Sequence, residues 1–115
     1  MVRATIEVKP RIVTKAGRAL GPGKADLLDQ IRATGSISAA AKAMEMSYSR
    51  AWQLVDTMNN AFKEPLVEAE TGGKRGGGAR VTETGAAVLE KYRAMQAAID
   101  HEAARHLSKF DVLLK

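Results

Sequence analysis

Five neighbouring residues carry side chains that can form directed hydrogen bonds with a polar partner: Ser47, Tyr48, Ser49, Arg50 and Gln53. Hydroxyl and carboxamide groups both donate and accept hydrogen bonds, and a guanidinium presents several donors in a planar fork. No histidine lies near them in the sequence to activate a serine as a nucleophile. This set therefore favours recognition by hydrogen bonding over a bond-breaking reaction.

A second set of candidate residues is basic. Lys74 and Arg75 lie among glycines in the segment GGKRGGGA, residues 72–79, and Arg80 follows directly. Glycine lets a backbone approach phosphates closely, and the two cations can neutralise phosphate charge. The phosphate-loop motif of nucleotide-binding proteins is absent, so a nucleotide site is not expected here. The alternative for this segment is a solvated polar loop without a partner.

Enzymatic and metal sites are disfavoured by the scarcity of suitable side chains. The chain contains no cysteine, and its only histidines are His101 and His106 in the run HEAARH. Zinc-protease helices place the second histidine four residues after the first, so that both rings share one face, but Arg105 holds that position. We therefore expect no catalytic residue, no metal site and no cofactor.

The basic residues are distributed unevenly along a chain of 115 residues, which is the length of one domain. Net charge is +5, and the first 24 residues hold one acid, Glu7, against six bases: Arg3, Lys9, Arg11, Lys15, Arg18 and Lys24. Basic blocks favour a polyanionic partner, and we expect the N-terminal bases to make secondary phosphate contacts. A solvated surface with a chance excess of charge is the alternative. No apolar run is long enough to span a membrane and no signal peptide is recognisable, so we expect a cytoplasmic protein.

The hydrogen-bonding residues lie on the second of two helices that the sequence predicts within residues 36–63. Ser36 and Ser47 precede these helices, where a serine oxygen can accept a first-turn N–H. Trp52 is expected to anchor the core, and a stacking platform is the alternative. The second helix repeats apolar residues at helical spacing (Ala51, Val55, Met58 and Phe62) opposite a polar face (Ser49, Arg50, Gln53, Thr57 and Asn60). A short helix braced by a longer one with a polar face is the helix-turn-helix arrangement, whose second helix enters the DNA major groove. An ordinary pair of antiparallel helices is the alternative.

The segments before this helix pair are predicted with simpler signals. Residues 5–8 and 11–14 carry β-branched residues and are predicted as N-terminal strands. Residues 24–34 are predicted as a helix with Asp26 in its first turn, and Gly35 supplies the stop.

The segments after the helix pair complete the predicted domain. A two-stranded wing is expected over residues 66–82, with the basic glycine loop at its tip. A helix follows over residues 83–110 with Thr82 as its N-cap, although Gly85 stands where a capping box carries Glu or Gln. The predicted fold class is mainly α with a small β-hairpin: a winged helix-turn-helix plus a long C-terminal dimerisation helix.

This last helix is expected to pair with its counterpart in a second copy of the chain. Its apolar residues recur at steps of three and four from Val88 to Phe110. Its length of about 40 Å is too great for so small a domain to cover. A two-fold homodimer would cover it and would place two recognition helices on an inverted-repeat operator. The alternative is a helix that breaks near Ala103 or Ala104 and folds back.

The runs SISAAAKAMEMSYSRAW, MNN and LVEAETGGKRGGGARVTETG resemble the N-terminal domain of ModE-type molybdate-responsive transcription regulators. A more distant resemblance to LysR-type winged helices rests on the pattern GSIS–AAA–S–T–G. The resemblance implies a winged helix-turn-helix fold, dimerisation, and regulation of molybdate-uptake and molybdoenzyme genes. Such regulators hold molybdate in C-terminal domains, so we expect these residues to bind none, which leaves room for a separate molybdate-binding partner. Glu45 departs from the pattern, because it occupies a turn position that glycine often holds.

Together these patterns predict a sequence-specific DNA-binding transcriptional regulator that is not an enzyme. We expect the five hydrogen-bonding residues to face base edges or nearby phosphates. Arg50 is the first choice for a guanine contact, because a guanidinium can pair with O6 and N7. Lys74 and Arg75 are expected to contact the DNA backbone at the wing, and Arg80 to add a secondary phosphate contact. The alternative from another class is a winged-helix module that binds a protein and no DNA, which the basic wing disfavours.

Overall fold

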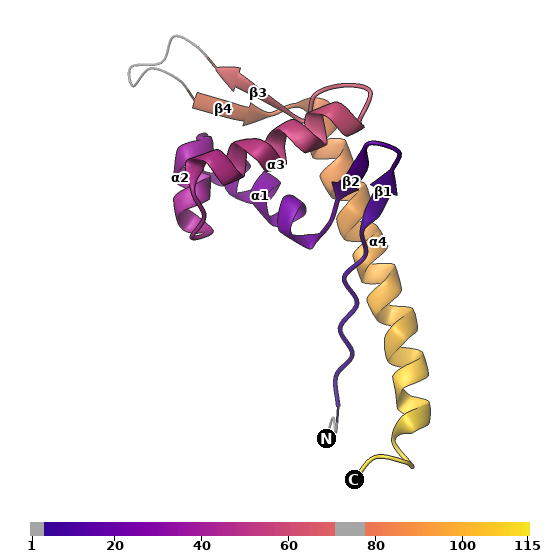
Figure 1. Cartoon of the computed structure of the whole chain (residues 1–115). Coiled ribbons are helices and arrows are strands. Elements are labelled where there is room, and N and C mark those ends of the chain that lie inside the picture. The colour runs from indigo at the N-terminus through magenta and orange to yellow at the C-terminus, as the bar shows by residue number, and fades with distance from the viewer. Residues whose placement is uncertain (1–3, 71–77) are drawn as a thin grey trace.

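The computed structural model describes residues 4–70 and 78–115. Its elements follow in the order β1 (Ile12–Thr14), β2 (Gly17–Leu20), α1 (Pro22–Thr34), α2 (Ile37–Ala43), α3 (Tyr48–Ala61), β3 (Val67–Glu70), β4 (Gly78–Val81) and α4 (Glu83–Leu107), with a final 3-10 turn at Ser108–Phe110. Both strand pairs, β1–β2 and β3–β4, are antiparallel (Figure 1). The predicted fold class, a mainly α winged helix-turn-helix with a small hairpin, is confirmed.

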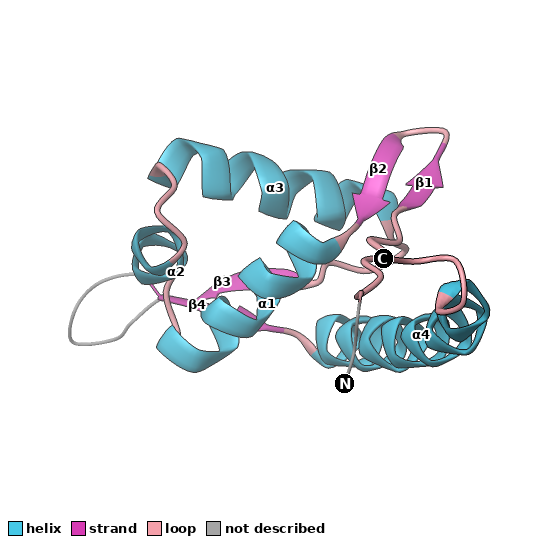
Figure 2. Cartoon of the chain, turned by 90° about the horizontal axis from the view of Figure 1, so that it is seen from below, coloured by secondary structure: helices cyan, strands magenta, loops and turns pink. Residues whose placement is uncertain are grey.

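The hydrophobic core lies where α1, α2 and α3 meet the base of the β3–β4 sheet (Figure 2). On α3, the predicted stripe of Ala51, Val55 and Met58 is fully buried, while Phe62 packs against the edge of the core. The other elements contribute Leu27, Leu28, Ile31, Ala40, Leu66, Leu89 and Tyr92. Each large apolar side chain buried in this way contributes about 1.5–3 kcal/mol. The core therefore sets the orientation of α3 and leaves its opposite side free.

Side-chain caps determine where three of the helices begin, as the sequence predicts. Ser36 Oγ accepts the backbone N–H three residues on at 3.1 Å, and Ser47 Oγ does the same at 3.0 Å. Thr82 Oγ1 accepts the N–H of Gly85 at 3.0 Å at the start of α4. Each bond satisfies a donor that helix geometry leaves free, and such a cap is worth about 1 kcal/mol.

The turn between α2 and α3 contains a left-handed backbone conformation at a residue that is not glycine. Glu45 has a φ of 55°, in the left-handed region, where a residue other than glycine costs about 1 kcal/mol. Met46, which follows, is partly buried against the core. Packing at this turn offsets the strain, so the expectation that Glu45 departs from the usual glycine without breaking the motif holds.

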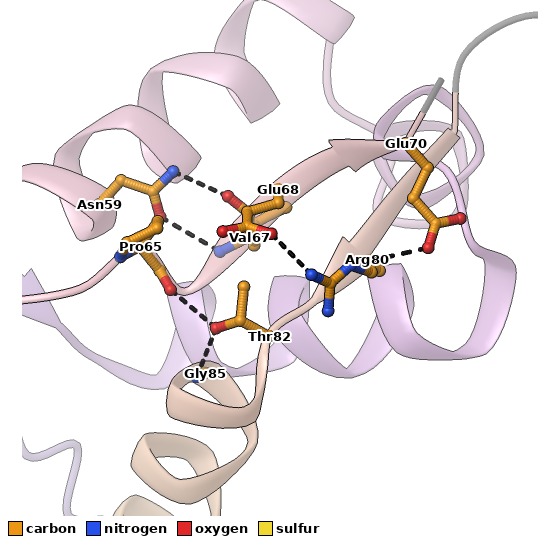
Figure 3. Close-up of polar contacts among 8 residues, drawn as sticks. All are labelled: Asn59, Pro65, Val67, Glu68, Glu70, Arg80, Thr82 and Gly85. Atoms are coloured by element: carbon orange, nitrogen blue, oxygen red, sulfur yellow. Dashed lines mark hydrogen bonds and ion pairs between the residues drawn. The ribbon is translucent and has the colours of Figure 1, made fainter. Parts of the chain in front are cut away.

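A network of hydrogen bonds fixes the base of the wing against α4 (Figure 3). Thr82 Oγ1 donates to Pro65 O at 2.7 Å, and the Thr82 backbone N–H donates to Leu66 O at 2.9 Å. Gly85 packs so closely here that a Cβ would lie 2.3 Å from Leu66 O. Glycine therefore replaces the Glu or Gln of a capping box because no side chain fits.

Helix α4 runs without a break from Glu83 to Leu107, and its C-terminal half extends beyond the body of the domain (Figure 1). The alternative with a break near residue 103 is therefore wrong. Arg93 joins the first half of α4 to α1 through Asp29 at 2.5 Å and Asp26 at 2.9 Å. These hydrogen bonds raise the pKa of Arg93 above its ordinary value. The sequence analysis placed Asp26 in the first turn of this helix. Because α1 begins at Pro22, Asp26 instead lies beyond the first turn.

The N-terminal prediction is only partly correct. Residues 5–8 form no strand, and the strand predicted at 11–14 pairs instead with Gly17–Leu20, which was not predicted as a strand. Gly17 has a φ of 116°, a conformation that glycine adopts without steric cost and that lets the chain reverse at once. Pro10, which lacks an N–H, separates residues 5–8 from this hairpin. Within the described residues, none of the helices combines the length and apolar composition that a membrane span requires.

Candidate nucleic-acid interface

Helix α3 presents distinct surfaces, because successive residues turn by about 100° around its axis. Ala51, Val55 and Met58 mark the buried side, with no exposed area. The rest of the helix forms an outer stripe of Ser49, Gln53, Asp56 and Asn60, a basic flank at Arg50 and Leu54, and an aromatic flank at Tyr48 and Trp52. The five predicted hydrogen-bonding residues thus share one end of α3 but not one face.

The outer stripe carries polar groups that packing does not use. Among the described residues, the side chains of Ser49, Gln53 and Asn60 have no hydrogen-bond partner, and all are exposed. Thr57, which the sequence analysis placed on the polar face, donates instead to Gln53 O within the helix, at 2.8 Å. A carboxamide can pair with adenine, and a carboxylate can accept from cytosine. Asp56 is therefore a candidate that sequence reasoning missed, although its spacing of three from Gln53 signals the shared stripe.

The aromatic flank corrects the prediction that Trp52 is a core anchor. Trp52 is 38% exposed and Tyr48 is 53% exposed. Trp52 follows the buried Ala51 by one residue, so it lies about 100° further around the helix and outside the core. Its indole Nε1 donates to the Tyr48 hydroxyl, and the two rings meet edge to face with centroids 6.4 Å apart. The pair lines a cavity of about 260 Å³ between α2, α3 and the β3–β4 sheet.

The basic flank faces the opposite way, towards the start of α1. Arg50 is exposed, and with Leu54 it lines a cavity of about 320 Å³ that also includes Arg18 and Lys24. Arg50 thus lies beside the outer stripe rather than on it. Ser47 caps the helix at this end, and its hydroxyl keeps a proton for a further hydrogen bond.

The wing holds the remaining predicted site residues. Arg80 lies on β4 and pairs across the sheet with Glu68 on β3, with 2.7 Å between Nη2 and Oε2 (Figure 3). Its Nε is 3.7 Å from Oε1 of Glu70. Any phosphate bound by Arg80 would share the guanidinium with these carboxylates. Lys74 and Arg75 lie outside the described residues.

Asn59 is a positioning residue that sequence reasoning missed. It is partly buried near the end of α3, and its carboxamide forms hydrogen bonds with the backbone at the beginning of β3. The only sequence signal was an amide residue shortly before the wing, which does not distinguish it from Asn60.

A family of known proteins and several solved structures are similar to this chain. The family model described as "Bacterial regulatory helix-turn-helix protein, lysR family" matches residues 22–86 of the chain. The solved CbnR DBD–DNA complex shares 20% identity with a TM-score of 0.58 over 76% of this chain and 94% of that chain, and it supports the fold alone. The full-length LysG from Corynebacterium glutamicum with bound effector Arg shares 27% identity with a TM-score of 0.54, over 78% of this chain and 29% of that chain.

Curated relatives share more of the sequence. The molybdenum transport protein ModE of Azotobacter vinelandii is 42% identical over 91 residues, which are 79% of this chain and 33% of that protein. The DNA-binding transcriptional dual regulator ModE of Escherichia coli is 40% identical over 92 residues, 80% of this chain and 35% of that protein. The chain spans about a third of the length of these relatives. The resemblance to the N-terminal part of ModE-type regulators is thereby confirmed, and the chain belongs to the lysR family of bacterial regulatory helix-turn-helix proteins.

Proposed function

We propose that the chain binds duplex DNA sequence-specifically and regulates transcription of molybdate-related genes. The observation that carries the proposal is the outer stripe of α3, where polar side chains line the exposed face of a helix braced on its other side and have no partner among the described residues. Folding does not need these groups, so their hydrogen-bonding capacity is available to a partner. A major groove about 12 Å wide admits one α-helix and displays donors and acceptors that differ for each base pair.

In this arrangement the outer stripe faces base edges, while the two flanks of α3 face the sugar–phosphate backbones on either side of the groove. Gln53, with Ser49 beside it, is the main base-reading candidate. Ser47 and Tyr48 lie at the helix start, where hydroxyl groups can reach phosphates. Lys74 and Arg75 extend the contact to the backbone at the wing, and Arg80 is a weaker candidate because it is paired with Glu68.

A homodimer is part of the proposal. The chain measures 60 × 29 × 21 Å along its principal axes, and the C-terminal half of α4 accounts for the long dimension (Figure 1). Ile99 and Leu107 on this half are only half-buried, and Phe110 beyond it is 53% exposed. Covering this helix with its counterpart would bury these side chains and place two copies of α3 on an inverted repeat.

We propose that the regulated genes respond to molybdate but that these residues do not bind molybdate themselves. The curated relatives are named for molybdenum transport or as ModE regulators, and the match covers about a third of them. We expect calorimetric titration of the chain with molybdate to show no saturable binding. The molybdate signal would then be received outside these residues, and a separate molybdate-binding partner is one proposal for its source.

The proposal is tested by measuring binding to the promoter of a molybdate transporter over a range of salt concentrations, with a shuffled duplex as control. Specific binding should exceed binding to the shuffled duplex by about 10³-fold or more. Equal affinity for both duplexes would reject sequence-specific recognition.

A protein-binding module without DNA binding is the second candidate, because Tyr48 and Trp52 form an exposed aromatic pair. Aromatic residues of this kind are enriched at protein interfaces. Absence of any DNA binding at low salt would favour it.

A further inference from the structure

One cavity on the basic flank gathers cations from parts of the chain that are distant in sequence. Arg11 precedes β1, Arg18 lies on β2, Lys24 lies in the first turn of α1, and Arg50 lies in the first turn of α3. All four line the same cavity of about 320 Å³, and none of the described residues that line it carries a carboxylate.

In the described part of the chain, the four cavity cations differ from three arginines that have acidic partners. Arg80, Arg93 and Arg105 form ion pairs with carboxylates. Among the described residues, none of the four cavity cations does so. Like charges gathered without counter-charges repel one another. The arrangement is therefore suited to a partner that brings negative charge.

The neighbouring cations affect the pKa of Lys24. Its Nζ donates to the backbone oxygen of Arg18 at 2.7 Å, which holds the ammonium at the junction of β2 and α1. Partial burial is the largest cause that lowers the pKa of Lys24, followed by the charges of Arg50, Arg18 and Arg11. An anion in the cavity would reverse this effect and favour the charged form of the lysine.

The start of α1 adds neutral donors to the same cavity. Its N-cap is Gly21, which has no side chain to accept a first-turn N–H, and Pro22 has no N–H of its own. The backbone N–H groups that follow, at Gly23 and Lys24, are left without a side-chain cap, and both residues line the cavity. The positive end of the helix dipole lies here as well.

We propose that this basic cavity binds one phosphodiester group of the DNA backbone beside the groove that α3 enters, and that Arg50 is one of its ligands rather than a base-reading residue. This inference rests on the proposed function. Arg50 and Gln53 are three residues apart and are therefore neighbours on the helix surface. A duplex whose bases contact Gln53 thus brings its backbone to Arg50. The β1–β2 hairpin then acts as a second backbone contact on the side of α3 away from the wing.

The test compares charge-removing variants of the full chain on an unrelated duplex, for which only backbone contacts matter. Arg18→Gln and Lys24→Gln should each reduce the slope of log affinity against log salt by about one. The control Lys91→Gln removes the same charge from an exposed position on α4 outside the cavity and should leave the slope unchanged. The Arg18 side chain makes no hydrogen bond within the described structure, so Arg18→Gln should leave the fold intact even if the lysine variant fails to fold. A slope equal to that of the wild type in both cavity variants would overturn the inference.

The source of the phosphate is decided by following the amide resonance of Gly23 by NMR. Addition of duplex DNA should shift it in the wild type, and Arg18→Gln should abolish most of that shift. Inorganic phosphate alone should produce no saturable shift at micromolar concentration; saturation there would identify a site for a small anion and overturn the assignment to DNA. If the wild type binds no DNA, the proposed function fails along with this inference. If the wild type binds DNA but both cavity variants keep the salt slope of the wild type, the inference alone fails.

Discussion

The carboxamide of Asn59 engages both backbone groups of Val67: Nδ2 donates to Val67 O at 3.0 Å, and the Val67 N–H donates to Oδ1 at 3.2 Å (Figure 3). The N–H of Leu66 donates to the same Oδ1 at 2.8 Å. Because Asn59 belongs to the helix that carries the outer stripe, and Val67 begins the wing, one side chain fixes the position of the wing relative to α3.

Replacing Asn59 by alanine should therefore destabilise the fold. The change removes the acceptor of two backbone N–H groups in a partly buried region, which costs about 1–3 kcal/mol. Asn60→Ala is the matched control, because Asn60 is exposed and has no partner in the described structure, so its effect should stay within about 0.5 kcal/mol. Urea denaturation of both variants measures the difference, and equal stability of the two would contradict the role of Asn59.

Gly85→Ala should also lower the free energy of unfolding. Its Cβ would lie 2.3 Å from Leu66 O and 2.8 Å from Cγ1 of Val81. The strand and helix must move apart to admit it, and overpacking of this kind costs about 1–3 kcal/mol. Gly23→Ala is a control of opposite sign: a Cβ at Gly23 meets nothing within 4 Å, so the variant should gain up to about 1 kcal/mol from reduced chain entropy. Thermal unfolding measures both, and a neutral Gly85→Ala would show that the contact relaxes freely.

The helices could be predicted from the sequence because their signals are local. Serine and threonine caps, Gly35 as a stop and an apolar stripe at helical spacing depend on neighbours within a few residues, and they gave nearly the observed bounds. The β1–β2 hairpin was missed because its second strand, GRAL, lacks the β-branched alternation that marks strands. Its formation depends on the turn at Gly17 and on packing of Ala19 and Leu20 into the core.

The candidate site shows the same division between local and long-range information. The polarity of the side chains along α3 indicates which residues are exposed. Trp52 was wrongly predicted to lie in the core, because a single residue step around the helix from the buried Ala51 already leads to the surface. The phosphate contact that we propose for Arg50 could not be inferred from α3 alone, because its neighbours Arg18 and Lys24 come from β2 and α1. Such a grouping is a property of the tertiary fold, and a linear sequence contains no spacing that signals it.

Gln53 and Arg50 should respond differently to substitution by alanine. Gln53→Ala removes the group that we propose reads a base, so it should weaken operator binding by about 1–3 kcal/mol and leave binding to unrelated duplexes nearly intact. Arg50→Ala removes a phosphate contact, so affinity should fall similarly on both duplexes. Paired measurements on operator and shuffled DNA separate the two roles. A loss confined to the operator in Arg50→Ala would instead support the guanine contact that the sequence pattern favours.

The surface area of the chain bears on the proposed dimer. A compact monomer of 12.3 kDa exposes roughly 6,100 Å², whereas this chain exposes 8119 Å². Stable protein interfaces bury about 1,200–2,000 Å² in total, and the projecting half of α4 is one contributor to the excess (Figure 1). Of the residues along the stripe, Leu89 and Tyr92 already pack on the body, which leaves Ile99, Ala103, Leu107 and Phe110 for a partner.

Ile99→Asp should convert the proposed dimer to a folded monomer. Ile99 lies outside the core cluster of the body, so a charge there should change the stability of the domain little while placing two carboxylates against each other in the dimer. Loss of the second half-site should reduce operator affinity far more than affinity for unrelated DNA, because non-specific binding depends on backbone contacts alone. Sedimentation and footprinting test both effects, with Asp100→Asn as a control at an exposed neighbouring position. If the wild type sediments as a monomer at tens of micromolar and still protects a single half-site, α4 must serve some purpose other than pairing.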